Sequence, residues 1–172
     1  MKEVVILRHG EKDGDKLTEE GVQACKLLAS RIGKFNVAVA SDRYRAIQTA
    51  ELVSGIPVHT DVRASVPQFP EAELDKLAEI QATHPLGIIG AIWQNESLIN
   101  DAREAGVKLL DLVKEVLTSL PRNGRALIVS HDGTLIGLEK LLKDESFDYV
   151  DHSFGPIEGI RVDERLGVDT FR

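Results

Sequence analysis

The sequence has only one cysteine, Cys25, and no hydrophobic run long enough to cross a membrane. A single thiol excludes a framework of internal disulfides and suits a reducing compartment. The apolar residues 4–7 run directly into charged residues, so this stretch is too short for a secretion signal or a membrane span. We therefore expect a soluble cytoplasmic protein with no membrane partner.

Positive charge is also scarce in this chain. It has 21 lysines and arginines against 28 aspartates and glutamates, which gives a formal net charge of -7 at pH 7. Such a chain has no general electrostatic attraction to nucleic acid, so any anion-binding site must be a local cluster of basic residues. We expect no nucleic-acid partner.

The common signatures of nucleotide, hydrolase and zinc sites are missing as well. No Gly-Xaa-Gly occurs among the 14 glycines, which excludes the dinucleotide fingerprint, and there is no P-loop. The Gly-Xaa-Ser-Xaa-Gly elbow of many hydrolases is absent too. The five histidines show neither the paired spacing of a zinc helix nor a partnership with Cys25. We expect no cofactor and no metal site.

What the chain does contain is an alternation of buried strands and amphipathic helices. Its 172 residues, 42% of them hydrophobic, suit one domain over residues 1–172 with a sizeable core. The patterns predict strands at residues 4–8, 37–41, 57–60, 126–130 and 157–162, and helices at 18–32, 45–54, 97–120 and 134–142. Residues 63–96, which hold three of the six prolines, show no clear pattern. The alternation predicts an α/β fold around a mainly parallel sheet.

Three of the predicted strands end in, and run on into, residues suited to a binding site, all of them polar except one glycine. They are Arg8, His9 and Gly10 after the first, Ser41, Arg43 and Arg45 after the second, and Ser130, His131 and Asp132 after the late strand. Because the carboxyl ends of parallel strands meet at one edge of a sheet, we expect these side chains to share one crevice. Guanidinium groups bind phosphate oxygens in bidentate fashion, so the sequence predicts a phosphoryl site there.

Three segments carry a resemblance to a known family. "LRHGE" after an amino-terminal strand, "SDRYRAIQTA" about thirty residues later and "VSHDG" after a late strand resemble the histidine phosphatase superfamily, also called the phosphoglycerate mutase-like family. "LTEEGVQA" and "NESLINDAREA" are similar to further segments of that family. The resemblance implies a three-layer α/β/α sandwich. It also implies that His9 is phosphorylated as the nucleophile and that Arg8, Arg45 and His131 hold the phosphate.

The chemistry of these residues agrees with those roles. A neutral imidazole can attack phosphorus in line and so divide one difficult displacement into two easier ones. The opposite ring nitrogen of His9 should then donate to a backbone carbonyl, which fixes the tautomer. Gly10 is expected to let the backbone come close to the phosphate, because it has no Cβ.

The proton donor for the leaving group has several candidates. Asp132 adjoins His131, and an "HD" pair is the pattern of the acid phosphatase and phytase branch of the family. The small phosphatases, which the short segment after "RHG" resembles more, use a glutamate further along the chain, where Glu71 and Glu73 lie. We favour Asp132. Arginines beside a carboxyl lower its pKa, so this role requires burial or a bound phosphate to raise the pKa.

The sequence thus predicts a metal-independent phosphatase that acts on a small phosphate ester or a phosphoprotein. Alternatives are a phosphomutase, which the short segment after "RHG" disfavours, and a binding module for a phosphorylated ligand that has no catalytic activity. Arg43 either reaches the phosphate or pairs with a surface carboxylate. The remaining histidines, His59, His84 and His152, and the Cys25 thiol are expected to be structural.

Overall fold

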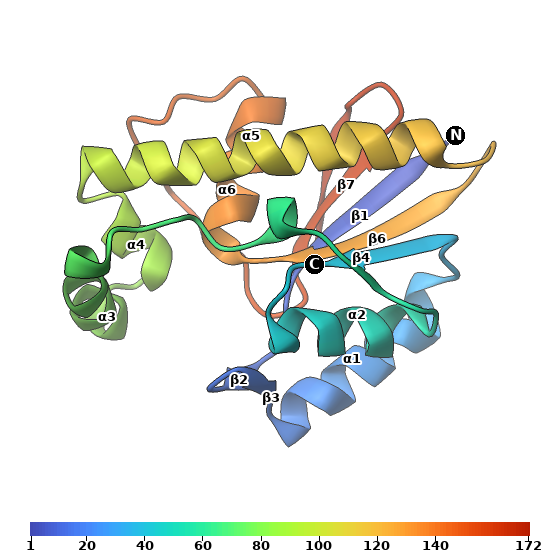
Figure 1. Ribbon diagram of the computed structural model, residues 1–172, viewed down its shortest axis with the longest axis horizontal. Helices are drawn as coiled ribbons and strands as arrows, with labels where there is room; N and C mark the ends of the chain where they lie inside the picture. The colour runs from blue at the N-terminus through green and yellow to red at the C-terminus, as the bar shows by residue number, and fades with distance from the viewer.

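The computed structural model describes the whole chain, residues 1–172, and its centre is a six-stranded sheet (Figure 1). The strands are β1 (Glu3–Arg8), β4 (Val37–Ala40), β5 (His59–Thr60), β6 (Arg125–Ser130), β7 (Gly159–Asp163) and β8 (Val168–Phe171). Their order in the sheet is β5-β4-β6-β1-β7-β8. The first four of these run parallel, and β7 and β8 add an antiparallel edge. The prediction of a mainly parallel sheet is confirmed.

Helices cover both faces of the sheet. The long helices are α1 (Glu19–Ile32), α2 (Tyr44–Ser54), α5 (Glu96–Ser119) and α6 (Asp132–Leu142). Figure 1 shows α1 and α2 on one face and α5 and α6 on the other. Each face has its own hydrophobic core, since alternate residues of the buried strands point to opposite sides. The architecture is therefore the three-layer α/β/α sandwich that the resemblance implied.

Local signals in the sequence explain where these helices begin and end. The Thr18 hydroxyl accepts a hydrogen bond from the Gly21 N–H and caps α1, and the Asn95 side chain caps α5 in the same way. Gly55 ends α2 in the left-handed conformation, with φ of 66°, which glycine adopts without strain. No helix is both long enough and apolar enough to cross a membrane.

The structure differs from the prediction in the segment 63–96 and in three short strands. Two 3-10 turns, η1 (Val62–Ala64) and η2 (Glu71–Glu73), precede α3 (Leu74–Thr83) and α4 (Ile88–Ile92), and these two helices form a lobe beside the sheet (Figure 1). Helix α3 fully buries only Leu77 and packs Ile80 against the core, so its apolar stripe is short. The hairpin of β2 (Lys12–Asp13) and β3 (Lys16–Leu17) and the edge strand β8 also went unpredicted.

Candidate active site

The register of the sheet brings the three predicted strand ends to one level. Arg8 of β1 lies opposite Ser130 of β6, and Ala40 of β4 lies opposite Val129. The residue that follows each strand therefore lies at the same edge, and the His9 N–H donates to the Ser130 carbonyl at 3.1 Å. Residues far apart in the sequence meet there because parallel strands share their direction.

His9 is buried at this edge and its tautomer is fixed. Its Nδ1 lies 2.8 Å from the Gly10 carbonyl oxygen, which can only accept, so Nδ1 carries the proton and Nε2 keeps its lone pair. Burial lowers the pKa of His9 to about 4; the Gly10 hydrogen bond opposes this shift, and the charges of Arg45 and Arg8 add to it. The imidazole is neutral at physiological pH, which is the state that a nucleophile needs.

His131 stands close to His9, with the two ring centroids 5.3 Å apart. Its Nε2 lies 2.7 Å from the Ser41 hydroxyl, and its Nδ1 accepts a 3.4 Å hydrogen bond from Arg45. Burial lowers the pKa of His131 well below its usual value, and the neighbouring His9 and arginines lower it further. His131 is therefore also neutral as long as no anion is present.

The two predicted arginines are held by partners on either side of the histidines. Arg45 donates to Asp15 at 2.7 Å, and its buried Nε has no partner in the protein. Arg8 donates to the Phe154 carbonyl at 2.6 Å and lies 3.7 Å from the Asp132 carboxyl. These contacts orient both guanidinium groups and leave donors on each of them for a ligand.

Asp132 is buried at the first turn of α6, beside Arg8. Burial raises the pKa of its carboxyl to about 6, although Arg8 and a 2.9 Å hydrogen bond from the Phe154 N–H act in the opposite direction. The burial that a proton-donating role requires is thus present. A carboxyl with such a pKa can hold a proton near neutral pH and release it to a leaving group.

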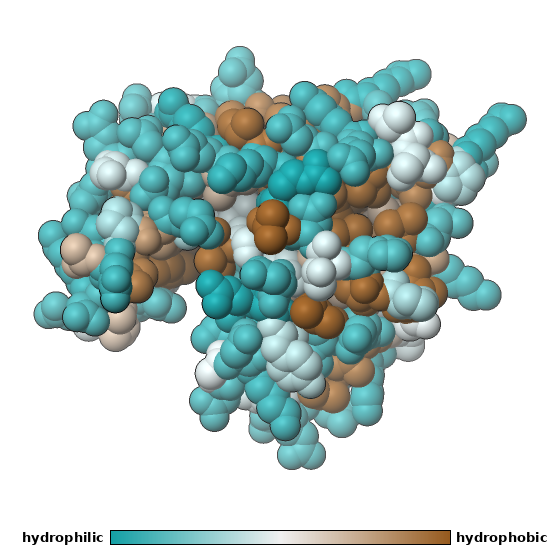
Figure 2. All heavy atoms as spheres, viewed as in Figure 1, coloured by the Kyte–Doolittle hydropathy of each residue, from teal (hydrophilic) through white to brown (hydrophobic).

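All five of these side chains line one cavity of about 230 Å³. Its other lining residues are Lys12, Val66, Pro67, Phe69, Gln81, Ile88, Ile92 and Gly133. Figure 2 shows the molecule hollowed between the lobe of α3 and α4 and the main body. The strand ends therefore form one side of the cavity, and the segment from Val66 to Ile92, which includes α4, forms the other. We call Arg8, His9, Arg45, His131 and Asp132 the floor.

The family model of the histidine phosphatase superfamily (branch 1) matches residues 4–152, which includes every floor residue. The chain belongs to the histidine phosphatase superfamily. No curated protein sequence matches this chain.

Solved structures of low sequence identity share the fold. A mycobacterial glucosyl-3-phosphoglycerate phosphatase with bound VO3 superposes with a TM-score of 0.72 at 18% identity, over 99% of this chain and 97% of that one. The phosphoserine phosphatase of Entamoeba histolytica, solved with 3-phosphoglyceric acid, has a TM-score of 0.66 at 21% identity, over 99% of this chain and 95% of that one. The protein YhfR of Bacillus stearothermophilus has the same values.

Within this superfamily member, the two glutamates considered as proton donors lie away from the floor. Glu71 is exposed in the turn η2 and does not line the cavity. Glu73 lines a separate small hollow with Lys76 and Leu77. Of the three candidates, the structure brings only Asp132 together with His9 and the arginines.

Three positioning groups have roles that the sequence did not predict, although Ser41 was expected in the crevice. The Ser41 hydroxyl holds His131, and the Thr49 hydroxyl accepts from the Gly10 N–H at 2.9 Å while donating to the Arg45 carbonyl at 2.7 Å. The main chain of Phe154 contacts both Arg8 and Asp132. The position of Ser41 after a strand predicted its place in the crevice but not its contact with His131; the contacts of Thr49 and Phe154 depend on the tertiary structure.

The reason for a glycine at position 10 differs from the prediction. A Cβ there would lie 3.2 Å from Cys25 Sγ and 3.2 Å from Leu17 Cδ2. These atoms belong to the protein interior, and Gly10 does not line the cavity. The absent side chain therefore makes room for packing against α1 and β3.

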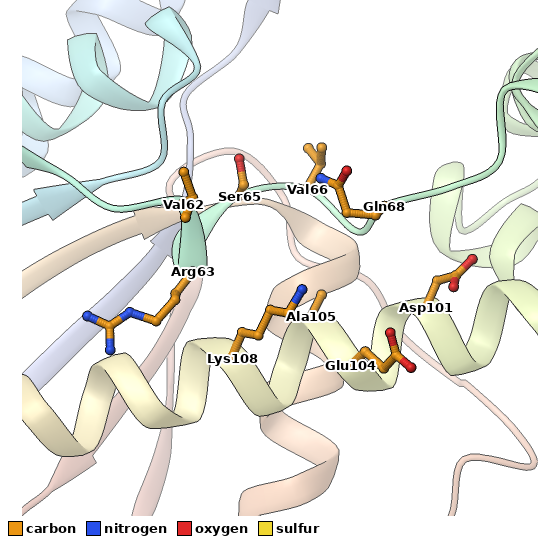
Figure 3. A pocket seen from close by; sticks show the side chains of 9 residues that line it. All are labelled: Val62, Arg63, Ser65, Val66, Gln68, Asp101, Glu104, Ala105 and Lys108. Carbon is orange, nitrogen blue, oxygen red and sulfur yellow. The ribbon is translucent and has the colours of Figure 1, made fainter.

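A second hollow, of about 50 Å³, lies between the segment 62–68 and α5 (Figure 3). Arg63 at its edge is occupied by Asp61 and Glu115, at 2.7 Å and 2.8 Å. No floor residue lines this hollow. Val66 lines both spaces, so they adjoin at this residue.

The residues predicted to be structural lie outside the cavity. Burial raises the pKa of the Cys25 thiol to about 11, which makes it unreactive. His59 is exposed, and His84 accepts a hydrogen bond from the Leu86 N–H. His152 pairs with the buried Glu139 at 2.6 Å. Arg43 is exposed and does not line the cavity; its charge lowers the pKa of His131, and its backbone N–H donates to the Ser41 hydroxyl at 3.3 Å.

Proposed function

We propose that this protein is a phosphatase that hydrolyses phosphomonoesters through a phosphohistidine on His9. One observation carries the proposal: a buried, neutral His9 keeps a free Nε2 lone pair beside Arg8, Arg45 and His131 in a single cavity. The family and the phosphatase names of its structural neighbours support it.

In the first step, the His9 Nε2 lone pair forms a bond to phosphorus as the bond from phosphorus to the ester oxygen breaks. The proton of the Asp132 carboxyl goes to that oxygen, so that an alcohol leaves. Arg8 and Arg45 stabilise the charge that spreads over the other phosphoryl oxygens. The buried Nε of Arg45 supports this role, because a donor without a partner is costly unless a ligand supplies the acceptor.

In the second step, the Asp132 carboxylate takes a proton from a water molecule as the water oxygen bonds to phosphorus. The bond from phosphorus to nitrogen breaks, its electron pair returns to His9, and inorganic phosphate is released. The negative charge of the phosphoryl group raises the pKa of His131 while it is bound, so His131 can then donate to it as a cation. The positive charge comes from side chains of the protein, and the mechanism needs no metal ion.

The short connection after His9 supports hydrolysis over phosphoryl return to the substrate. Between β1 and α1 the chain forms only the small hairpin β2–β3, where mutases of the family carry a longer loop. A binding module without catalysis is disfavoured by the joint presence of two neutral histidines, two arginines and a buried acid.

The proposal is tested by trapping the intermediate. Rapid quench with a labelled ester should yield a phosphoryl enzyme that is stable in base and labile in acid. His9→Ala should lower turnover about 10⁴-fold or more, whereas His59→Ala, which changes an exposed histidine, should not. A chelator should leave activity unchanged, and vanadate should inhibit competitively. Normal turnover by His9→Ala, or a strict need for a divalent ion, would contradict the mechanism.

A further inference from the structure

We propose that the preferred substrate is a small phosphomonoester whose organic part is uncharged and apolar, and that residues 66–92 select it. This inference rests on the proposed phosphatase activity and concerns the part of the cavity that the phosphoryl group does not occupy. It favours a small ester over a phosphoprotein.

The side of the cavity facing the floor is apolar. We call its residues the wall; they are Val66, Pro67, Phe69, Ile88 and Ile92. The charged or titratable lining residues are the floor residues and Lys12. The charge of Lys12 lowers the pKa of His9, so Lys12 lies near the end of the cavity where the phosphoryl group would bind. Gln81 supplies the only polar side chain opposite the floor.

The wall is fixed in place before any ligand arrives. Ile92 is fully buried in the larger hydrophobic core, and Phe69 and Ile88 pack against that core. The Ser130 hydroxyl donates to the Ala64 carbonyl and the Thr134 hydroxyl to the Ser65 carbonyl, both at 2.7 Å. These bonds tie the start of the wall segment to β6 and α6. The cavity is therefore pre-formed, so binding an apolar group there costs little ordering of the protein.

The wall also touches the first turn of α6 at Gly133, the residue that follows the floor residue Asp132. A Cβ on Gly133 would lie 3.2 Å from both Ile92 Cδ1 and Pro67 Cγ, so the glycine is what lets the wall close over the first turn of α6. The two sides of the cavity therefore meet near Gly133, and they differ in chemistry. A phosphoryl group on the floor directs its ester oxygen, and hence its organic part, toward apolar side chains.

The same geometry disfavours a substrate with a second ionised group. A carboxylate or ammonium placed against the wall would lose water and find no opposite charge, which is unfavourable. A phosphopeptide would bring main-chain N–H and C=O groups to the wall, where only the Gln81 amide could replace their water. An alkyl or aryl group, in contrast, gains from the burial of its apolar surface.

The test compares phosphate esters of primary alcohols, so that the phosphoryl chemistry stays constant. The set is 2-phenylethyl phosphate, glycerol 1-phosphate, 3-phosphoglycerate and a phosphoserine peptide. We expect kcat/KM for 2-phenylethyl phosphate to exceed that for 3-phosphoglycerate by about 10-fold to 100-fold, the range that hydrophobic pockets provide. Equal or faster turnover of 3-phosphoglycerate or of the phosphopeptide would overturn the inference.

A charge placed on the wall should reverse the order. Ile88→Lys should raise kcat/KM for 3-phosphoglycerate relative to 2-phenylethyl phosphate about tenfold or more, since it supplies the missing cation. Leu74→Lys is the matched control: it makes a similar change at an exposed position of the same lobe outside this cavity, and it should leave the ratio unchanged. Ile88→Thr, a milder change in case Ile88→Lys fails to fold, should lower the preference severalfold.

Binding to His9→Ala separates this inference from the proposed function. In that variant no phosphohistidine can form, so the ratio of dissociation constants for 2-phenylethyl phosphate and 3-phosphoglycerate reports the wall alone. Tighter binding of the apolar ester with no turnover of any ester by the native enzyme would contradict the proposed function and leave only the preference of the wall for an apolar group. Turnover of all four esters at similar rates, with equal dissociation constants, would support the proposed function and overturn the inference.

Discussion

The floor and the wall of the cavity differ in how the chain builds them. The floor collects the ends of three parallel strands, whose register fixes the level of each side chain. The wall comes from one continuous stretch of 3-10 turns, loops and short helices. A phosphoryl group is the same in every ester, whereas the organic part varies. The rigid part of the fold thus holds the constant part of the substrate, and the loop-rich part meets the variable one.

The two sides also differ in what they contribute to stability. His9, His131 and Asp132 are polar and at most 5% exposed, so their burial costs free energy that the chemistry requires. Wall residues such as Ile92 belong to the main core and stabilise the fold. Substitutions of the floor residues that bind the phosphoryl group should therefore affect every ester alike. Substitution of the acid Asp132 should depend on the leaving group, and substitutions on the wall should change the ranking of esters.

The largest effect that tests this comparison is expected for Arg45→Ala. By analogy with arginines that stabilise a transferring phosphoryl group, kcat/KM should fall about 10³-fold. The fall should be the same for apolar and charged esters, and inhibition by inorganic phosphate should weaken in parallel. Arg31→Ala, at an exposed position near the end of α1, serves as the control. A loss confined to one class of ester would show that Arg45 contacts the organic part and would break the distinction.

Asp132→Asn should give a smaller effect that depends on the leaving group. A positioned acid contributes about 10²-fold or more for an alkyl ester, whereas nitrophenolate leaves with little help. With a pKa of about 6, Asp132 loses its proton as pH rises. Hence kcat/KM for the alkyl ester should fall above pH 6 relative to that for p-nitrophenyl phosphate, and Asp132→Asn should remove this difference.

The matched controls for that experiment are Glu71→Gln and Glu73→Gln. Both positions lie outside the cavity, so neither substitution should show leaving-group dependence. If Glu71→Gln alone slows the alkyl ester while sparing p-nitrophenyl phosphate, the assignment of Asp132 is wrong.

The same contrast explains which parts of the molecule could be predicted from the sequence. Buried strand segments such as residues 4–7 and 126–129 are continuous apolar runs, and the polar residues after them are easy to locate. Helix α3 fully buries only Leu77 and α4 spans five residues, so the apolar pattern of each helix is too short to stand out in the sequence. Predicting the wall requires knowing where that segment folds back, which is a property of the tertiary structure.

Within the floor, the sequence predicted side chains better than their environment. The roles of His9, Arg8, Arg45 and His131 came from motif and strand position, and these four side chains do meet in one cavity. The pKa of Asp132 depends on the balance between burial and Arg8, which only the fold determines. The hydrogen bonds from the main chain of Phe154 were beyond reach, because every residue has the same backbone groups.

The smallest expected effect is on the free energy of unfolding, and it measures how much the buried Asp132 carboxyl destabilises the fold. The pKa of Asp132 is about 6 in the folded protein against 3.8 as the ordinary value, so between these values the native state binds more protons than the unfolded state. Stability from this group is therefore greatest below pH 4 and falls as pH rises through 6. The shift corresponds to at most about 3 kcal/mol in the free energy of unfolding.

Asp132→Asn keeps an Oδ1 acceptor for the Phe154 N–H but cannot ionise. The free energy of unfolding of the variant minus that of the native protein should thus be larger at pH 8 than at pH 4 by up to that amount. Urea midpoints of both proteins at each pH measure this difference. Asp75→Asn, at an exposed carboxyl of the wall's lobe, should show no such change. A pH-independent difference for Asp132→Asn would mean that the carboxyl is not desolvated on the floor, and the contrast between a costly floor and a stabilising wall would fail.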